Sequence, residues 1–187
     1  GIGLAVNWQN LIAGKSGIGK ITLFDATANE TKIAGEVKDF DPTQFIDRKE
    51  ARRMDRFAQL AVAAAGEAIK SSGLKITPEN QYSVGSVIGS GIGGLSGIAD
   101  TSLLLKEKGA RRVSPFFIPG RLINLAGGYV SIKHQLKGPN HAVVTACATG
   151  THAIGDAARI VALGDAEVRV AGGTESSVCR IGMVGFV

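Results

Sequence analysis

Residues 142–160 read Ala-Val-Val-Thr-Ala-Cys-Ala-Thr-Gly-Thr-His-Ala-Ile-Gly-Asp-Ala-Ala-Arg-Ile, and this stretch decides the fold. Its first part contains Val143 and Val144, two β-branched residues in a short apolar run, which is typical of a buried strand. From Ala153 onward, apolar residues recur at helical spacing, which predicts an amphipathic helix. The stretch therefore predicts a strand, a turn and a helix, with Cys147 at the junction.

The position of Cys147 suits a nucleophile. A thiol at the start of a helix faces backbone N–H groups that lack an intrahelical partner and the positive end of the helix dipole, which together favour the thiolate. Small residues bound the turn on both sides, and a strand-turn-helix elbow of this kind exposes a nucleophilic side chain. The alternative is that Cys147 is a small core residue, as many free cysteines are.

Upstream, residues 83–88 read as a second strand, followed directly by Gly89-Ser90-Gly91-Ile92-Gly93-Gly94. The glycines match the dinucleotide-binding fingerprint, in which a glycine-rich turn after a strand approaches a pyrophosphate. Such a site also needs an acidic residue at the end of the next strand to hold the ribose, and the next candidate region, residues 111–119, has none. A dinucleotide-binding domain is therefore an alternative that titration with nicotinamide nucleotides would test.

Helical and strand patterns alternate along the rest of the chain. Asp47 and Glu50 predict a helix start, and Gly73 predicts the end of the apolar stripe that follows, namely Met54, Phe57, Leu60, Ala61, Ala64, Ala68 and Ile69. Further patterns predict a helix ending at 103–109, a helix or pair of turns over 122–136, and a strand over 167–173. This alternation predicts an α/β fold with a helix-covered sheet.

Basic residues crowd the start of the helix that begins near Asp47: Arg48, Lys49, Arg52, Arg53 and Arg56. The helix dipole disfavours positive charge at this end, so these residues cost helix stability. They form either a solvated face that Glu50 and Asp55 partly offset or a docking surface.

The composition bounds the class of protein and its partners. The chain has 187 residues, 44% hydrophobic and 20% charged, which suits one soluble globular domain with a sizeable core. It shows neither a membrane-spanning run nor a leader, so we expect a cytoplasmic location, bacterial or in an organelle matrix. Cys147 and Cys179 are far apart and lack metal-ligand spacing, so we expect no metal site and interpret Cys179 as structural.

The net charge of +5 suggests an acidic partner. Aromatic residues make up only 5% and no nucleic-acid motif is present, so we expect neither nucleic acid nor a membrane as partner. A small acidic carrier protein fits the charge.

The run Thr145-Ala-Cys-Ala-Thr-Gly-Thr-His-Ala-Ile-Gly-Asp-Ala-Ala-Arg, followed by Gly-Asp-Ala and Val-Ala-Gly-Gly-Thr-Glu, resembles the active-site region of the β-ketoacyl-ACP synthases. These are acyltransferases of fatty-acid synthesis, and the chain is most similar to their type II members. Gly-Ser-Gly-Ile-Gly-Gly, Arg-Arg-Val-Ser-Pro-Phe-Phe-Ile-Pro and Lys-Gly-Pro-Asn extend the resemblance over nearly the whole chain but only the first half of a synthase. It implies the N-terminal half of a thiolase-like, layered α/β/α/β/α fold with a mixed sheet.

The resemblance implies decarboxylative condensation without a cofactor. Cys147 would hold an acyl group taken from acyl carrier protein, and a carbanion from malonyl-carrier protein would attack it. The Cys147 backbone N–H would be one oxyanion donor. Residues 1–187 would be an N-terminal half-domain, because the family's catalytic histidine and lysine motifs are absent from this sequence.

The resemblance also assigns site residues. The residue matching Ile92 gates the acyl-chain pocket, and the residue matching Phe117 reaches across a homodimer interface to line the partner's pocket. Adjacent phenylalanines between prolines also suit simple core packing. The positions that help to dock the acidic carrier protein correspond to Lys49, Arg52, Arg53, Arg111 and Arg112.

The three histidines, His134, His141 and His152, are interpreted as satisfied or exposed rather than catalytic. On a helix, the five-residue spacing from Cys147 turns His152 away from the thiol. Other readings stay open: a thiolase, a polyketide ketosynthase, or a non-catalytic carrier-binding module, although such a module has no chemical use for Cys147. In the residues before Val6, the first strand of the family is left in doubt because most of its following turn is missing.

Overall fold

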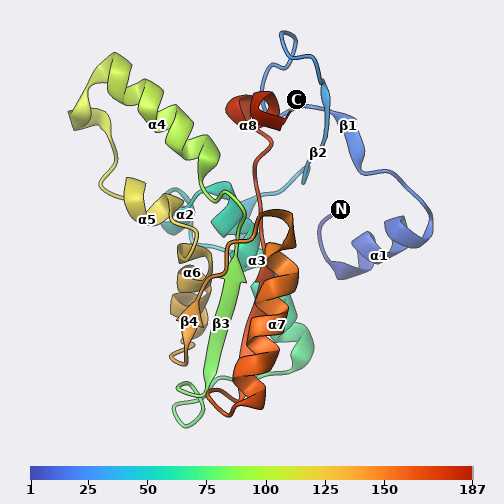
Figure 1. Cartoon of the computed structure of the whole chain (residues 1–187), viewed down its shortest axis with the longest axis vertical. Coiled ribbons are helices and arrows are strands. Elements are labelled where there is room, and N and C mark those ends of the chain that lie inside the picture. Colours follow the sequence, from blue (N-terminus) through green and yellow to red (C-terminus); the bar gives the residue numbers. More distant parts are fainter. Residues whose placement is uncertain (187) are drawn as a thin grey trace. The chain divides into compact units, whose positions relative to one another are not determined.

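The computed structural model describes residues 1–186 and divides into two compact units (Figure 1). The larger unit is Pro42–Ser176, and the smaller comprises Gly1–Asp41 and the segment from Ser177 onward. The smaller unit contains helix α1 (Leu4–Ile12), the antiparallel strands β1 (Ile18–Lys20) and β2 (Ile33–Gly35), and helix α8 (Arg180–Phe186). Residues 1–12 hold no strand, because the chain enters α1 directly after Gly3.

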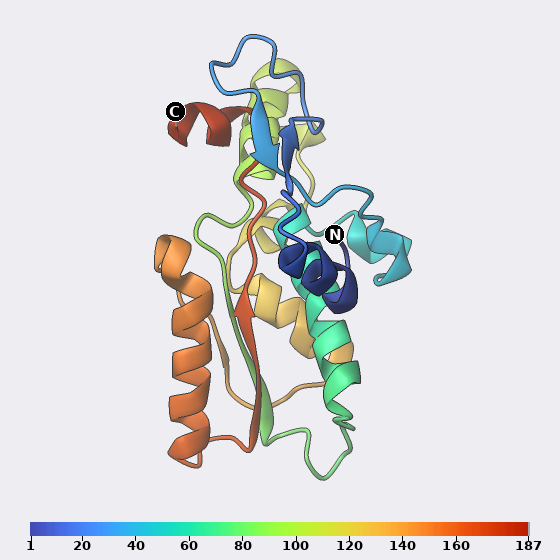
Figure 2. The same ribbon diagram turned by 90° about the vertical axis from the view of Figure 1, so that its right-hand side faces the viewer.

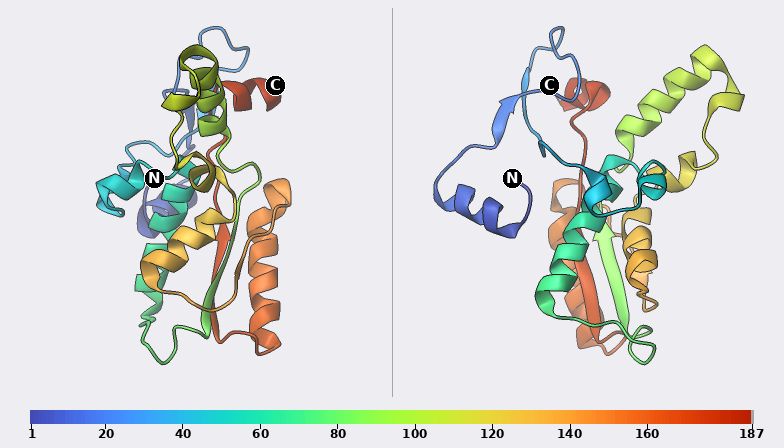
Figure 3. Two further views of the ribbon diagram at one scale, coloured as in Figure 1. Left: turned by 90° about the vertical axis from the view of Figure 1, so that its left-hand side faces the viewer. Right: turned by 180° about the vertical axis from the view of Figure 1, so that it is seen from behind.

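The larger unit is built on a three-stranded parallel sheet in the order β4-β3-β5. The strands are β3 (Val84–Gly89), β4 (Asn140–His141) and β5 (Val168–Gly173), and β3 pairs with both others. Helices α3 (Arg56–Ser72) and α6 (Leu125–His134) cover one face, and α7 (Thr149–Ala162) covers the other (Figures 2 and 3). This arrangement is the helix-covered sheet that the alternating sequence pattern predicts.

Every residue of β3 is buried, and its side chains alternate between two packing environments. Val84 and Ile88 join the main core with the α3 and α6 residues, whereas Val87 packs with Ala153 and Ala157 of α7. A parallel strand buried on both faces is apolar or small throughout, as here.

The basic segment differs from the single helix predicted there. Asp47 caps a short helix, α2 (Arg48–Ala51), by accepting the backbone N–H groups of Lys49 and Glu50. The chain then turns, and α3 begins at Arg56 with Asp55 as its N-cap. The predicted end of α3 is confirmed, because Gly73 adopts the left-handed conformation with φ 71°.

The predicted buried strand at Val143 and Val144 is wrong. Strand β4 ends at His141, and Val144 is 52% exposed. The Val143 carbonyl lies where a Cβ on Gly89 would be, so the chain approaches the end of β3 closely, although the strand pairing ends at His141. The apolar run therefore leads into the cysteine turn rather than extending the sheet.

The remaining elements complete the larger unit: η1 (Pro42–Gln44), α4 (Leu95–Lys108), η2 (Ala110–Arg112), α5 (Phe117–Arg121) and η3 (Ala146–Ala148). The helix predicted over 122–136 is α6, and Gly127 does not break it. A Cβ at Gly127 would lie 3.2 Å from the Ser86 hydroxyl oxygen, so glycine admits α6 close to β3. Within residues 1–186, we find no helix with the length and apolar character to span a membrane.

Candidate active site

Cys147 lies in the turn η3, immediately before α7, and its side chain is exposed. Its neighbour Ala146 has φ 51°, in the left-handed region that non-glycine residues rarely adopt. Such a conformation costs about 1–3 kcal/mol and persists only where the surroundings hold it. The cysteine is therefore presented by a strained elbow at a helix start.

Thr149 holds this elbow from inside. Its buried hydroxyl accepts the Thr145 N–H at 2.9 Å, and the Ala148 N–H donates to the Thr145 carbonyl at 3.1 Å. The Thr149 methyl group fills the space beside Gly89, where an added Cβ would come within 2.5 Å of it. The end of β3 and the start of α7 therefore fix the backbone around Cys147.

The histidines have other neighbours. His152 Nδ1 lies 2.7 Å from the Thr145 hydroxyl oxygen, so it contacts the residue that begins the elbow. His141 Nε2 lies 3.7 Å from an Asp156 carboxylate oxygen. His134 is on α6, across the sheet from α7, and burial, with a smaller contribution from Lys133, lowers its pKa.

The glycine-rich loop after β3 lies against the elbow. A Cβ on Gly91 would be 3.4 Å from Ala146 Cα and 3.1 Å from Glu175 Oε2. The same Glu175 oxygen accepts the Ile92 N–H at 3.0 Å and contacts the Ser90 hydroxyl at 3.3 Å. The structure therefore brings the predicted gate residue Ile92 close to the cysteine elbow.

Sequence reasoning misses Glu175 as a site residue. Its signal is the Gly-Gly-Thr-Glu run at the end of β5, which a parallel register places beside the end of β3. Thr174 donates its N–H to the Gly89 carbonyl at 3.0 Å, which brings the Glu175 side chain to the loop.

Three backbone amides of this loop already donate hydrogen bonds within the protein. Glu175 occupies the Ile92 N–H, the Ser90 hydroxyl accepts the Gly93 N–H at 2.9 Å, and the Gly94 N–H donates to the Arg121 carbonyl at 3.2 Å. A phosphate site at a helix start needs such groups unpaired. The dinucleotide alternative is therefore disfavoured by the geometry.

The predicted pocket residue Phe117 is the first residue of α5 and is half-buried. The Gly-rich loop packs on the segment that follows α5, because a Cβ on Gly93 would lie 2.7 Å from the Ile123 side chain. The Ile92 loop therefore contacts the cysteine elbow on one side and the segment after α5 on the other.

The predicted docking residues fall into two environments. Lys49, Arg52, Arg111 and Arg112 are exposed, the last two in η2 beyond α4. Arg53 is half-buried, and its guanidinium carbon lies 4.0 Å from the centre of the Phe116 ring. Arg53 is therefore already engaged in a cation–π contact.

Within residues 1–186, no group of three or more His, Cys, Asp or Glu side chains is arranged to hold a metal ion.

A parallel sheet between helix layers, with a cysteine elbow at the start of one covering helix, gives the larger unit a layered α/β fold of the thiolase-like class, as its structural neighbours show. The chain belongs to the beta-ketoacyl synthase family: the family model for "Beta-ketoacyl synthase, N-terminal domain" matches residues 1–187. The family resemblance seen in the sequence is thereby confirmed.

Relatives and solved structures agree with this assignment. The chain is 53% identical over 194 residues to 3-oxoacyl-[acyl-carrier-protein] synthase 2 of Rhizobium meliloti (strain 1021), covering 100% of this chain and 46% of the relative. The ishigamide ketosynthase/chain length factor matches 100% of this chain and 46% of its own, with TM-score 0.88 and 26% identity. A ketosynthase complex with a type II PKS acyl-carrier protein, AntDE:AntF, matches 79% of this chain and 43% of its own, with TM-score 0.74 and 25% identity. The chain thus spans about half the length of its curated relative.

Proposed function

We propose that this chain is the nucleophile-bearing half of a type II β-ketoacyl-ACP synthase that elongates fatty acyl chains. The observation that carries the proposal is the exposed Cys147 in its strained elbow, within a chain of the beta-ketoacyl synthase family. The relative with 53% identity is named a 3-oxoacyl-[acyl-carrier-protein] synthase 2, whereas the structure described with a type II PKS acyl-carrier protein shares 25% identity. Fatty-acid elongation is therefore favoured over polyketide synthesis.

The chemistry begins with acyl transfer. The Cys147 thiolate attacks the thioester carbonyl of an acyl carrier protein, a new C–S bond forms, and the carrier thiol leaves with a proton. The Cys147 N–H stabilises the oxyanion of the tetrahedral intermediate. Malonyl-carrier protein then loses carbon dioxide, and the resulting carbanion attacks the Cys147 thioester to give a β-ketoacyl-carrier protein and free Cys147.

The second half of the site belongs to a further domain in this proposal, with residues 1–187 as the N-terminal half-domain. Ile154 and Val161 are seven residues apart on α7 and therefore lie on the same face of the helix, where both are exposed, at 59% and 40%. Contiguous exposed apolar surface marks an interaction site. A C-terminal half that supplies the histidine and lysine groups would cover this face and bury it beside Cys147.

Carrier docking is assigned to the exposed basic residues Lys49, Arg52, Arg111 and Arg112, with Arg53 supporting them through Phe116. A positive surface and a net charge of +5 attract an acidic carrier protein. A solved neighbour described as a ketosynthase in complex with an acyl-carrier protein supports a carrier protein as the partner. The proposal includes a cytoplasmic homodimer in which Phe117 of each subunit lines the acyl pocket of the other, opposite Ile92.

The test is the mass of the full-length protein before and after incubation with a long-chain acyl carrier protein. Wild type should gain one acyl group, and Cys147→Ala should gain none because the nucleophile is missing. Cys179→Ala is the matched control and should be acylated like wild type, since Cys179 lies outside the elbow. Acylation of Cys147→Ala, or none of wild type, would contradict the proposal.

A further inference from the structure

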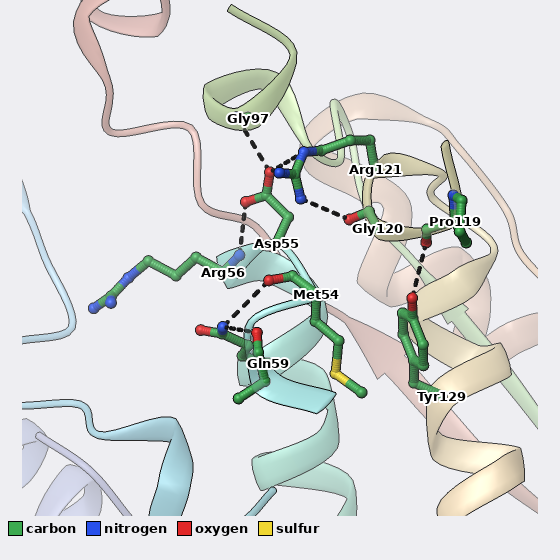
Figure 4. A network of polar contacts seen from close by, with 10 residues as sticks. Met54, Asp55, Arg56, Gln59, Gly97, Pro119, Gly120, Arg121 and Tyr129 are labelled. Carbon is green, nitrogen blue, oxygen red and sulfur yellow. Dashed lines mark hydrogen bonds and ion pairs between the residues drawn. The ribbon is translucent and has the colours of Figure 1, made fainter. Parts of the chain in front are cut away.

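A buried ion pair joins three segments of the larger unit. Asp55 Oδ2 lies 3.3 Å from Arg121 Nε, and the two side chains are 6% and 24% exposed. The same carboxylate accepts the Arg56 N–H at 2.6 Å and the Gly97 N–H at 3.2 Å (Figure 4). One carboxylate therefore connects the start of α3, the first turn of α4 and the last residue of α5.

Backbone contacts tighten this junction. The Asp55 N–H donates to the Gly120 carbonyl at 3.1 Å, and the Gly94 N–H donates to the Arg121 carbonyl at 3.2 Å. The Arg121 guanidinium lies against Gly97, in space that a Cβ would need. Glycine at this position therefore admits the ion pair.

Each connected segment carries residues of the proposed site. Arg53 and Arg52 lie two and three residues before Asp55, and Phe117 begins the helix that Arg121 ends. Ile92 belongs to the loop that enters α4. The docking surface, the pocket-lining helix and the gate loop thus meet at one carboxylate.

We propose that Asp55 and Arg121 are a positioning pair that couples carrier docking to acyl-chain selection. This inference rests on the proposed function. The pair itself makes no contact with substrate. The pair fixes the Arg52 segment, the Phe117 helix and the Ile92 loop in one arrangement, so that a docked carrier delivers its acyl chain in line with the pocket. Losing the pair changes both the Michaelis constant for acyl carrier protein and the preference for chain length.

A buried ion pair defines geometry more than it adds net stability. Removing one partner leaves an uncompensated buried charge, whereas removing both charges does not. The single variants Asp55→Asn and Arg121→Met therefore break the pair, and the double variant Asp55→Asn with Arg121→Met removes both charges while keeping a side-chain oxygen for the Arg56 and Gly97 N–H groups. Asp100→Asn, an exposed carboxylate elsewhere on α4, is the matched control.

The experiment uses the full-length protein and three measurements. Acylation of Cys147 is followed with short- and long-chain acyl carrier proteins and with the same acyl groups on a small pantetheine thiol. The rate at which iodoacetamide alkylates Cys147 measures the reactivity of the thiol in its elbow, without a carrier or an acyl chain. We expect KM for acyl carrier protein to rise about tenfold in all three pair variants, because small misplacements are costly in positioned reactions. The ratio of long- to short-chain rates should shift with carrier-bound and pantetheine-bound acyl groups alike, while alkylation of the pair variants and all rates of Asp100→Asn stay at wild-type values.

The outcomes separate this inference from the proposed function. A wild-type protein that no carrier acylates overturns the proposed function and the inference with it. Normal wild-type acylation, with KM and chain preference unchanged in the folded double variant, overturns only the positioning role. Alkylation that falls as far as carrier-dependent acylation would show a general structural defect and also overturn it. If the single variants fail to fold, the double variant decides.

Discussion

The two faces of the parallel sheet bury different numbers of side chains. We call the face toward α3 and α6 the closed face and the face toward α7 the open face. Toward α3 and α6, Val84 and Ile88 of β3 pack into an extended core around the fully buried Phe57. Toward α7, the buried cluster contains only Val87, Ala153 and Ala157. The face that carries Cys147 is therefore the less complete one, which is expected if another domain must close over the nucleophile.

The largest expected effect lies on the closed face. Phe57→Ala would remove a fully buried ring from the main core and should lower the free energy of unfolding by about 3–5 kcal/mol, the usual cost of such a cavity. Urea denaturation followed by circular dichroism measures it. A loss below about 1 kcal/mol, typical of surface substitutions, would mean that this face is not the stabilising core.

A smaller effect tests the open face. In the 187-residue chain alone, Ile154→Ser should change the free energy of unfolding by no more than about 0.5 kcal/mol, because Ile154 is exposed. In the full-length protein, the same substitution should cost about 2 kcal/mol or more if a second half buries the side chain.

The matched control for that comparison is Ala153→Ser, which changes the neighbouring buried position that already packs on Val87. It should destabilise both the short and the long polypeptide. Equal small effects of Ile154→Ser in both would contradict the proposed cover over α7.

The same contrast explains what the sequence predicts well. Periodicity identifies elements whose burial is completed within the chain, such as β3 and the α3 stripe ending at Gly73. It fails at Val143 and Val144, where an apolar run serves the turn into the elbow rather than the sheet. An apolar composition indicates that a segment is shielded from water. It does not indicate whether the segment is shielded by strand pairing or, as here, by a close approach to Gly89.

The candidate site shows a similar limit. Cys147 is evident from its local pattern, because an apolar run, small residues and a helix start are consecutive in sequence. Glu175 and the Asp55–Arg121 pair are not, since their contacts with Ile92 and Gly97 join segments more than 40 residues apart. Polar contacts between segments far apart in the chain produce no periodic pattern in the amino-acid sequence. Only the register of β3 with β5 and the packing of α3, α4 and α5 bring them together.

The smallest expected effect is a pH dependence on the closed face. Burial lowers the pKa of His134, whose Nε2 is buried without a hydrogen-bond partner in the described structure. A histidine with a lowered folded-state pKa binds its proton more weakly when folded, so its contribution to stability is present above the unfolded-state pKa and is lost as the pH falls toward the folded value. Wild type should therefore lose unfolding free energy below about pH 6.5, the ordinary histidine value. His134→Gln should lose less over the same interval, measured by urea denaturation at a series of pH values. His152→Gln, at a ring exposed on α7, controls for replacing a histidine as such, and an unchanged slope in His134→Gln would show that α6 does not exclude the charged ring.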